Sequence, residues 1–283
     1  MELSFLGTAA SEGYPVAFCG CANCERARAL GGPNLRNRSA AVVDGVLLLD
    51  LGPDVMAASL AYGIPLTGVR YCLLTHEHED HLDASHLLSR SPFNEVEAPR
   101  MTLYATAGAL ARAATAIDHH LPPGGLLDPA VQDQLNLAIH PIAPGETFDA
   151  GPYRVTAVPA AHGAKIVPLL HIVERDGRAL FYATDTGPLP DAAWEILAGW
   201  GGRFDVVVLD HTFGMKERST GHNNTEQFME TIDRLRADGR LADGCRIFAH
   251  HIGHHSNPDH DALSLFAASR GYAVAHDGLT VQV

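Results

Sequence analysis

The sequence contains no hydrophobic run long enough to cross a membrane. A transmembrane helix needs about 18 or more consecutive apolar residues, and no stretch of the 283 residues reaches that length. The first residues, Met1 to Leu6, also lack the basic region and the long apolar region of a secretory signal peptide. We therefore expect a cytoplasmic protein that has no membrane partner.

Basic residues are scarce as well. Lys and Arg number 20 against 33 Asp and Glu, so the formal net charge is −13 with the 17 histidines neutral. Proteins that bind the phosphate backbone of nucleic acids need basic patches. Nucleic acid is therefore not an expected partner, except as small nucleotides. Bound divalent cations would offset part of the negative charge locally, which leaves room for a small anionic substrate.

Only five cysteines occur, and three of them stand together as Cys19-x-Cys21-x-x-Cys24. The other two, Cys72 and Cys245, lie alone beside apolar residues and are expected to be small buried side chains. Disulfides are rare in the cytoplasm, so the cluster predicts a metal site rather than a disulfide framework. Three thiolates need a fourth ligand to complete a tetrahedral zinc site. The alternative is three reduced cysteines without a metal.

The most informative stretch is Thr75-His76-Glu77-His78-Glu79-Asp80-His81, which directly follows the apolar run 69–74. Imidazole nitrogen and carboxylate oxygen are the ligands of zinc and similar divalent ions. In an extended turn, alternate side chains point the same way, so His76 and His78 can share one ion. Asp80 and His81 are then displaced toward a second ion. Glu77 and Glu79 are expected to face away as solvated acids, and a wholly solvated polar loop is the alternative interpretation.

Residues of the types that bind metals recur at the ends of three further predicted strands. His162 follows the apolar run 153–158, Asp185 follows the run 178–183, and His251 follows the run 246–249. In open α/β sheets, ligands bind outside the carboxyl ends of the strands. One histidine at such a place is usually structural, but four ligand-bearing strand ends in chain order predict a metal centre. His250 competes with His251 for the last position.

Strand and helix signals alternate in two groups along the chain. Asp44-Gly45 and Asp176-Gly177 predict tight hairpin turns, and residues 107–117 form an alanine-rich run with good helix propensity. This order predicts an α/β fold, with residues 1–283 forming one domain of two sheet-and-helix halves. Residues 107–136 are interpreted as an insertion. It either covers the site or has no role there. His119 and His120 within it are expected on the surface.

The run His-x-His-x-Asp-His after a strand resembles the signature of the metallo-β-lactamase superfamily. The resemblance implies a four-layer αββα sandwich that binds two metal ions. It assigns the first metal to His76, His78 and His162, and the second to Asp80, His81 and His251. Asp185 would bridge the two metals. His251 is preferred to His250 because residues 249–254 resemble a His-Ile-Ser-His run of the family. Asp50 resembles the buried acid that orients metal-binding histidines; otherwise it caps the next helix.

The cysteine cluster narrows the resemblance to PhnP-like phosphodiesterases, in which such a cluster and a late histidine hold a structural zinc. His254 is the candidate fourth ligand, and His255 and His260 are the alternatives. His222, in the run 219–225 before a helix, matches a family histidine that contacts the phosphate and can protonate the leaving oxygen. His211 also lies at a strand end and is the second candidate for that role.

Together these features predict a phosphodiesterase that hydrolyses small phosphodiesters, and we expect these to be cyclic. The attacking hydroxide would be held by two metal ions, Zn²⁺ or Mn²⁺. Asp80 and His222 are the expected catalytic residues. A carboxylate at Asp185, where β-lactam-cutting relatives often have cysteine, favours phosphoester chemistry. The alternatives are tRNA 3′ processing, a thioesterase, a lactonase, or a non-hydrolytic binding protein similar to PqqB. A homodimer is also expected.

Overall fold

Two seven-stranded sheets form the centre of the protein, which is described here by a computed structural model covering all 283 residues. In spatial order, the first sheet consists of β14 (Thr280–Gln282), β1 (Glu2–Gly7), β2 (Ala40–Val43), β3 (Leu47–Leu49), β4 (Tyr71–Leu73), β5 (Met101–Ala105) and β6 (Leu137–Pro141). The second consists of β13 (Ala273–Val274), β12 (Leu241–His250), β11 (Phe204–Asp210), β10 (Arg178–Ala183), β9 (Leu169–Arg175), β8 (Tyr153–Pro159) and β7 (Thr147–Ala150).

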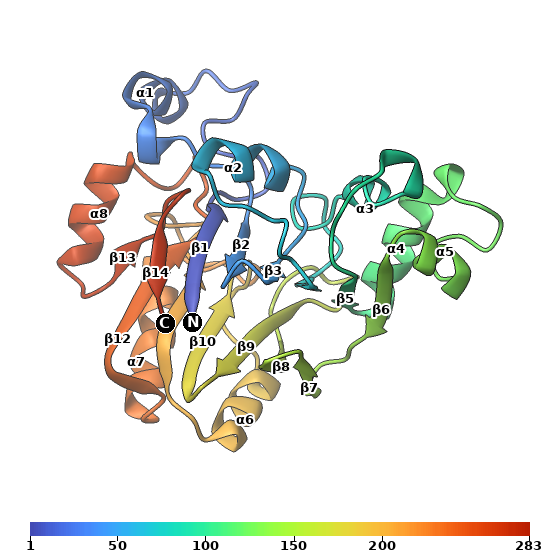
Figure 1. Cartoon of the computed structure of the whole chain (residues 1–283). Helices are drawn as coiled ribbons and strands as arrows, with labels where there is room; N and C mark the ends of the chain where they lie inside the picture. The colour runs from blue at the N-terminus through green and yellow to red at the C-terminus, as the bar shows by residue number, and fades with distance from the viewer.

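Each sheet is antiparallel in one part and parallel in the other. Strands β3 to β6 run parallel in the first sheet, and β10 to β13 run parallel in the second. The predicted hairpins at Asp44-Gly45 and Asp176-Gly177 join the antiparallel pairs β2–β3 and β9–β10, and both aspartates have positive φ angles. The terminal strands β1 and β14 lie side by side, so the two chain ends meet (Figure 1).

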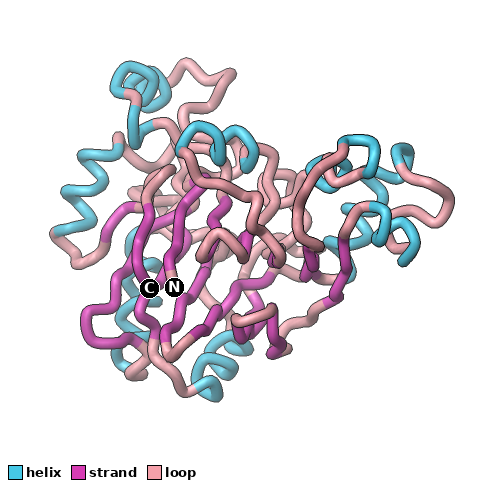
Figure 2. Tube along the Cα trace, in the orientation of Figure 1, coloured by secondary structure: helices cyan, strands magenta, loops and turns pink.

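Helices cover the outer faces of the sheets, while strands occupy the middle of the molecule (Figure 2). They are α1 (Ala22–Leu30), α2 (Val55–Tyr62), α3 (Ser85–Leu88), α4 (Ala107–Ile117), α5 (Pro129–Gln134), α6 (Asp191–Trp200), α7 (Thr225–Ala237) and α8 (His260–Ala268), with short 3-10 turns at Gly32–Asn34, Pro92–Asn94 and Asp118–His120. None of these helices has the length and hydrophobicity that crossing a bilayer requires.

Three hydrophobic clusters hold the four layers together. The central cluster joins the facing sides of the two sheets, for example Phe5 and Leu49 with Val155 and Val206. Helices α2 to α5 pack on the first sheet through a second cluster, and α6 to α8 pack on the second sheet through a third. Because both faces of the central strands are covered, runs such as residues 206–209 are apolar without alternation, and each fully buried side chain contributes about 1.5–3 kcal/mol. The predicted αββα sandwich is confirmed.

The structure differs from the sequence prediction mainly at element boundaries. Strands β6 and β7 were not predicted, because both lie at sheet edges, are half exposed, and in β6 include a proline, which weakens the strand signal. Helix α8 begins at His260, where the side chain of Asp259 caps it by accepting a hydrogen bond from the N–H of Ala262. Strand β12 begins at Leu241, five residues before the predicted start at Arg246.

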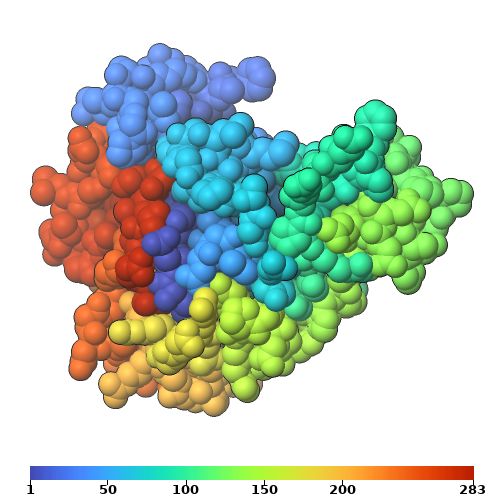
Figure 3. Space-filling model, in the orientation of Figure 1, coloured from blue at the N-terminus to red at the C-terminus, as the bar shows by residue number.

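The predicted insertion is a helical crossover between the parallel strands β5 and β6. Helices α4 and α5 bury Leu110, Ala113 and Val131 against the outer face of the first sheet. His119 and His120 are exposed, as predicted. The region from α3 to α5 projects at one end of the molecule, in blue-green to green in Figure 3.

The loops that leave the strands pack closely against one another at two glycines. A side chain at Gly52 would overlap the backbone carbonyl of Asp80, and one at Gly187 would overlap that of Thr220. Glycine is therefore needed at both positions for close backbone approach. The first contact holds the loop after β4, and the second holds the loop between β11 and α7.

Candidate metal centre

The loops after β4, β8 and β10 bring three histidines and an aspartate to one point. Nδ1 of His78 lies 3.0 Å from Nε2 of His76 and 3.0 Å from Nε2 of His162. The carboxylate of Asp185 completes the group, with Oδ2 3.2 Å from Nε2 of His76. These are the residues that the resemblance assigns to the first metal, and the structure places their ligand atoms together.

A second group shares Asp185. Nε2 of His81 lies 3.1 Å from Oδ2 of Asp80 and 3.1 Å from Oδ2 of Asp185. Nε2 of His251, from the end of β12, lies 3.5 Å from Oδ2 of Asp80 and 3.7 Å from Oδ2 of Asp185. Asp185 thus lies between the two groups, in the position predicted for a bridging carboxylate.

The donor atoms of the second group fit a cation. Four buried atoms here have no hydrogen-bond partner: Oδ2 of Asp80, Nε2 of His81, Oδ1 of Asp185 and Nε2 of His251. Burying polar atoms without partners costs about 1–3 kcal/mol each, so a protein rarely gathers several of them. Nitrogen and oxygen atoms facing one another are the set that zinc and related divalent ions bind. An ion bound in the second group would satisfy the atoms of Asp80, His81 and His251, whereas Oδ1 of Asp185 faces His162 and His222 at 3.2 Å each.

The pKa values of the side chains show which of them are ionised before a metal binds. Burial opposes ionisation of Asp185, but His251 and His76 hold the pKa of its carboxyl well below its usual range. Burial likewise opposes ionisation of Asp80, and His81 outweighs it, so the pKa of Asp80 is lowered. Burial lowers the pKa of His162 to about 4 and leaves its imidazole neutral. Burial opposes protonation of His81 and His251, but Asp80 outweighs it at His81 and Asp185 outweighs it at His251, so the pKa of each is raised. Because metals require neutral imidazoles and ionised carboxylates, metal binding would displace the protons of these two histidines.

Neighbouring side chains fix the orientation of the ligand histidines. Nδ1 of His81 lies 2.7 Å from Oδ2 of Asp50, whose Oδ1 accepts hydrogen bonds from the backbone N–H and the hydroxyl of Thr75. Asp50 is fully buried, so it orients a histidine rather than capping the following helix. On the other side, Nδ1 of His251 lies 2.8 Å from the hydroxyl of Thr212.

His250 points away from the site. Its Nε2 donates to the carbonyl of Gly7 at 3.0 Å, and its Nδ1 lies 2.8 Å from the hydroxyl of Thr184. Both ring nitrogens are therefore engaged, and His251 is the residue that the structure places in the group, as the sequence interpretation preferred.

The backbone is unusual at three residues of the site. Asp50, Asp185 and His251 have φ angles of 66°, 54° and 56°, in the left-handed region that non-glycine residues seldom adopt. Each such residue costs about 1–3 kcal/mol and persists where the surroundings impose it. All three lie where a strand ends and its loop turns toward the metal groups.

His222 is not part of these two groups, but with Asp210 it forms a further group that shares Asp185 and His251 with them. Its Nδ1 is 3.2 Å from Oδ1 of Asp185 and 3.3 Å from Oδ2 of Asp210, and its side chain is 23% exposed. Burial lowers the pKa of His222, but hydrogen bonding and attraction to Asp210 outweigh burial and raise it to about 9.

Asp210 was not predicted to have a role. It is fully buried at the end of β11, and its carboxylate contacts His222, the hydroxyl of Thr212 and the backbone N–H of Asn223. Its position in the sequence could have indicated this role. Asp210 ends an apolar strand in the same way as Asp50, which was predicted to orient a histidine.

His211, the second candidate for the role of His222, is a structural residue. It is fully buried, its Nδ1 lies 2.9 Å from Oδ1 of Asn257, and its Nε2 lies 3.2 Å from the hydroxyls of Thr225 and Tyr272. Burial also lowers its pKa to about 4. It has no free nitrogen to offer a substrate.

The prediction for Glu77 was wrong. Its Oε2 is buried without a hydrogen-bond partner, and its carboxylate packs against Gly108 at the start of α4. The sequence could not show this, because the contact depends on how α4 lies against the metal loop. Glu79 is exposed and pairs with Arg112 at 2.6 Å, in keeping with a solvated acid.

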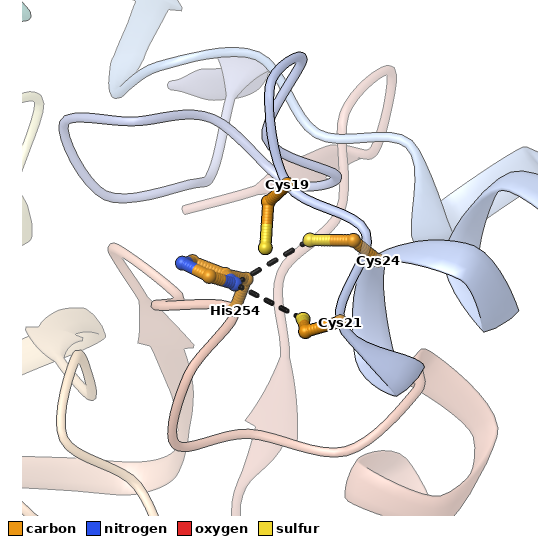
Figure 4. A group of neighbouring side chains, drawn as sticks. All are labelled: Cys19, Cys21, Cys24 and His254. Carbon is orange, nitrogen blue, oxygen red and sulfur yellow. Dashed lines mark hydrogen bonds between the residues drawn. The ribbon is translucent and has the colours of Figure 1, made fainter.

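The cysteine cluster gathers around His254 (Figure 4). Nδ1 of His254 lies 3.6 Å from Sγ of Cys21 and 3.4 Å from Sγ of Cys24, and Cys19 belongs to the same group. The backbone N–H of Cys24 and the His254 ring lower the pKa of the Cys21 thiol to about 6. Three sulfurs and one imidazole nitrogen form the donor set of a closed tetrahedral zinc site.

Neither of the two alternative fourth ligands belongs to the cysteine group. Nδ1 of His260 lies 2.8 Å from a guanidinium nitrogen of Arg36, and Nδ1 of His255 lies 3.5 Å from Oε1 of Glu12. Of the isolated cysteines, Cys72 is buried, as predicted, and Cys245 is only half-buried.

Comparison with solved structures agrees with this architecture. A diphosphatase from the PhnP family is 22% identical, with a TM-score of 0.73 over 100% of this chain and 97% of that one. Zn²⁺-bound PqqB from Methylobacterium extorquens is 24% identical, with a TM-score of 0.74 over the full length of both chains. Human tRNase Z, short form, is 16% identical, with a TM-score of 0.65 over 100% and 99% of the chains. These likenesses concern the fold.

Sequence comparison identifies the family. No curated protein sequence matches this chain. The family model described as the beta-lactamase superfamily domain, however, matches residues 46–252, which is well over half of the chain and runs from β3 through the metal loop to His251. The chain therefore belongs to the beta-lactamase superfamily, as the His-x-His-x-Asp-His run indicated.

Proposed function

We propose that the protein is a metal-dependent phosphodiesterase that hydrolyses small, cyclic phosphodiesters. The observation that carries this proposal is the position of Asp185, a carboxylate between two ligand groups with His222 directly beside it. Carboxylate oxygens suit the hard metal ions that handle phosphate oxygens. The solved PhnP-family diphosphatase with the same fold is consistent with phosphate chemistry.

The partly exposed residues of the site support an approach of the substrate from their side. Asp80, His81, Asp185 and His251 are buried, whereas His78, His162 and His222 are partly exposed. Two metals bound by these ligands would supply Lewis acidity and an activated water. His222 then faces the substrate from the exposed side and can donate a proton to the leaving oxygen. Nδ1 of His222 lies 3.3 Å from Oδ2 of Asp210, which would leave Nε2 free for the substrate.

The other activities find less support. The net charge of −13 disfavours the long RNA contacts of tRNA 3′ processing. A non-hydrolytic binding protein would not need a full set of catalytic ligands, yet every ligand position here is occupied by a suitable side chain. Thioesterase and lactonase activities are distinguished from phosphodiesterase activity by comparing the rates of hydrolysis of the three substrate classes.

A substrate panel tests the proposal. Protein loaded with Zn²⁺ or Mn²⁺ is expected to hydrolyse 2′,3′-cyclic nucleotides and bis(p-nitrophenyl) phosphate with a higher kcat/KM than acyl thioesters or lactones. The chelated protein serves as the control and is expected to be inactive with every substrate. Faster thioester or lactone hydrolysis would reassign the activity, and no turnover at full metal loading would favour a binding protein.

We also propose that Cys19, Cys21, Cys24 and His254 hold one structural zinc. Thiolates are softer ligands than the nitrogen and oxygen atoms of the other two groups, so this ion should be held more tightly. Purified protein is expected to carry a labile metal pair and one tightly held zinc per chain, and chelation should abolish activity before it removes the last zinc.

The substitution Cys21→Ser checks the zinc assignment. It removes one of the three sulfur ligands and is expected to eliminate the tightly held zinc, as measured by elemental analysis after mild chelation. Cys245→Ser is the matched control, because Cys245 is a free cysteine outside the group. Unchanged zinc content in Cys21→Ser would exclude the structural zinc.

A further inference from the structure

His254 has a carboxylate on the side of its ring that faces away from the sulfurs. Its Nδ1 faces Cys21 and Cys24, while its Nε2 lies 3.5 Å from Oε1 of Glu12 (Figure 4 shows the sulfur side). The same carboxylate oxygen lies 3.5 Å from Nδ1 of His255. Glu12 thus contacts the two adjacent histidines but none of the sulfurs.

We propose that Glu12 is a positioning residue for the thiolate site, where its carboxylate accepts the Nε2 hydrogen of His254 and keeps Nδ1 turned toward the sulfurs. A neutral imidazole carries its hydrogen on one nitrogen only, so a partner at Nε2 decides which nitrogen can bind a metal. Histidines that ligate metals commonly donate their other N–H to a carboxylate or carbonyl. This inference rests on the structural zinc proposed above.

Glu12 is itself held in place. The hydroxyl of Ser11 donates to Oε2 of Glu12 at 3.1 Å, which leaves Oε1 for the two histidines. The backbone on either side is anchored too: the N–H of Ala10 donates to the carbonyl of Ile252 at 3.2 Å, and Tyr14 pairs with Arg36 through two backbone hydrogen bonds. The Glu12 side chain is 28% exposed, so its effect on His254 is one of orientation more than of strong charge attraction.

The backbone of His254 is held independently of Glu12. Nδ2 of Asn23 donates to the carbonyl of His254 at 2.9 Å and to that of Asn257 at 3.2 Å. Loss of Glu12 is therefore expected to free the ring of His254 while its main chain stays in place. Because His251 lies three residues earlier, the same segment connects the thiolate site to the metal centre.

Glu25 offers a matched control. It follows Cys24 directly in the sequence, carries the same charge and is exposed, but its carboxylate pairs with Arg28 at 2.7 Å and does not contact His254. Removing Glu25 changes the net charge beside the cluster without removing the partner of Nε2.

The experiment measures metal affinity at the cysteines in the full-length protein. Zn²⁺ affinity is measured by chelator competition, and the absorption spectrum of the Co²⁺-substituted site is recorded. Glu12→Ala is expected to weaken Zn²⁺ binding by about 10–100-fold and to alter the d–d bands of cobalt, whereas Glu25→Ala matches the wild type. Glu12→Gln should show a smaller loss, because its amide oxygen still accepts the Nε2 hydrogen. The metal-free forms of all variants should unfold at the same temperature.

Three results would overturn the inference. An equal loss in Glu12→Ala and Glu25→Ala would assign the effect to net charge alone. An unchanged affinity and cobalt spectrum in Glu12→Ala would show that Nε2 needs no carboxylate. A lower unfolding temperature of the metal-free Glu12→Ala protein, with unchanged affinity, would make Glu12 a structural residue. If Glu12→Ala fails to fold, Glu12→Gln decides by the same measurements. Wild-type protein without tight zinc would instead refute the structural zinc itself.

Discussion

Replacing Asp185 by alanine is expected to lower kcat by at least about 10³-fold while the protein stays folded. The carboxylate lies 3.2 Å from His76 and 3.1 Å from His81, one residue of each ligand group, so its loss affects both metals. Metal stabilisation of developing charge is worth several kcal/mol, and about 1.36 kcal/mol corresponds to a factor of ten in rate. Fold stability rests on the clusters between and outside the sheets. The measurements are kcat at matched metal loading and the unfolding temperature.

Asp80→Ala is expected to have the same outcome, because Oδ2 of Asp80 faces His81 and His251 and has no other hydrogen-bond partner. Glu79→Ala is the control from the same loop. Glu79 is exposed and pairs only with Arg112, so its removal should leave turnover and metal content unchanged. Retained turnover in either aspartate variant, at matched metal content, would rule out the assigned metal pair.

The ligand groups could be predicted from the sequence because their residues occupy strand ends. Each strand end places one side chain at the edge of its sheet, which made His76, His162, Asp185 and His251 candidates. Their division into two metal groups came from the family resemblance. The alternation of strand and helix signals supported only an α/β class, and the four-layer arrangement came from the family resemblance. Where the strand signal was strong, at β10, the predicted run 178–183 coincides with the observed strand.

The contacts that orient the ligands could not be predicted, because they depend on side chains distant in the sequence. Asp210 contacts His222 from 12 residues away, and Cys24 contacts His254 across 230 residues. No periodicity in the sequence encodes such pairs. The family resemblance supplied His254, whereas nothing in the sequence connected Glu12 with it.

The left-handed backbone conformation at Asp50, Asp185 and His251 could not be predicted from the sequence either. Glycine is the residue that signals such a conformation in a sequence, and none of these positions has it. The strain is tolerated because buried neighbours hold each residue: Asp50 binds Thr75 and His81, and His251 lies against Thr212. Sequence reasoning fails here at the functional site, where local preference is overruled by the surrounding structure.

His222→Ala is expected to lower kcat by about 10²–10⁴-fold for substrates with poor leaving groups, the usual contribution of a general acid. Nδ1 of His222 is held between Asp185 and Asp210, at 3.2 and 3.3 Å, on the exposed side of the site. Metal content should stay intact if Asp80, His81, Asp185 and His251 hold the second ion without His222; a loss of metal in His222→Ala would instead make His222 a ligand, as its place near Asp185 and His251 allows. The loss should shrink for a nitrophenolate leaving group, which departs without a proton. The measurement is kcat for a 2′,3′-cyclic nucleotide and a nitrophenyl ester, with metal analysis of each sample.

Two further variants separate proton transfer from phosphate binding. His222→Gln keeps a hydrogen-bond donor but cannot transfer a proton, so it should lose as much kcat as His222→Ala with the cyclic nucleotide while KM changes less. His119→Ala removes an exposed histidine that belongs to none of the ligand groups, and it should behave as the wild type. An equal loss for good and poor leaving groups would restrict His222 to phosphate binding. Full activity of His222→Ala would leave the leaving oxygen to be protonated by solvent, since His211 has both ring nitrogens engaged.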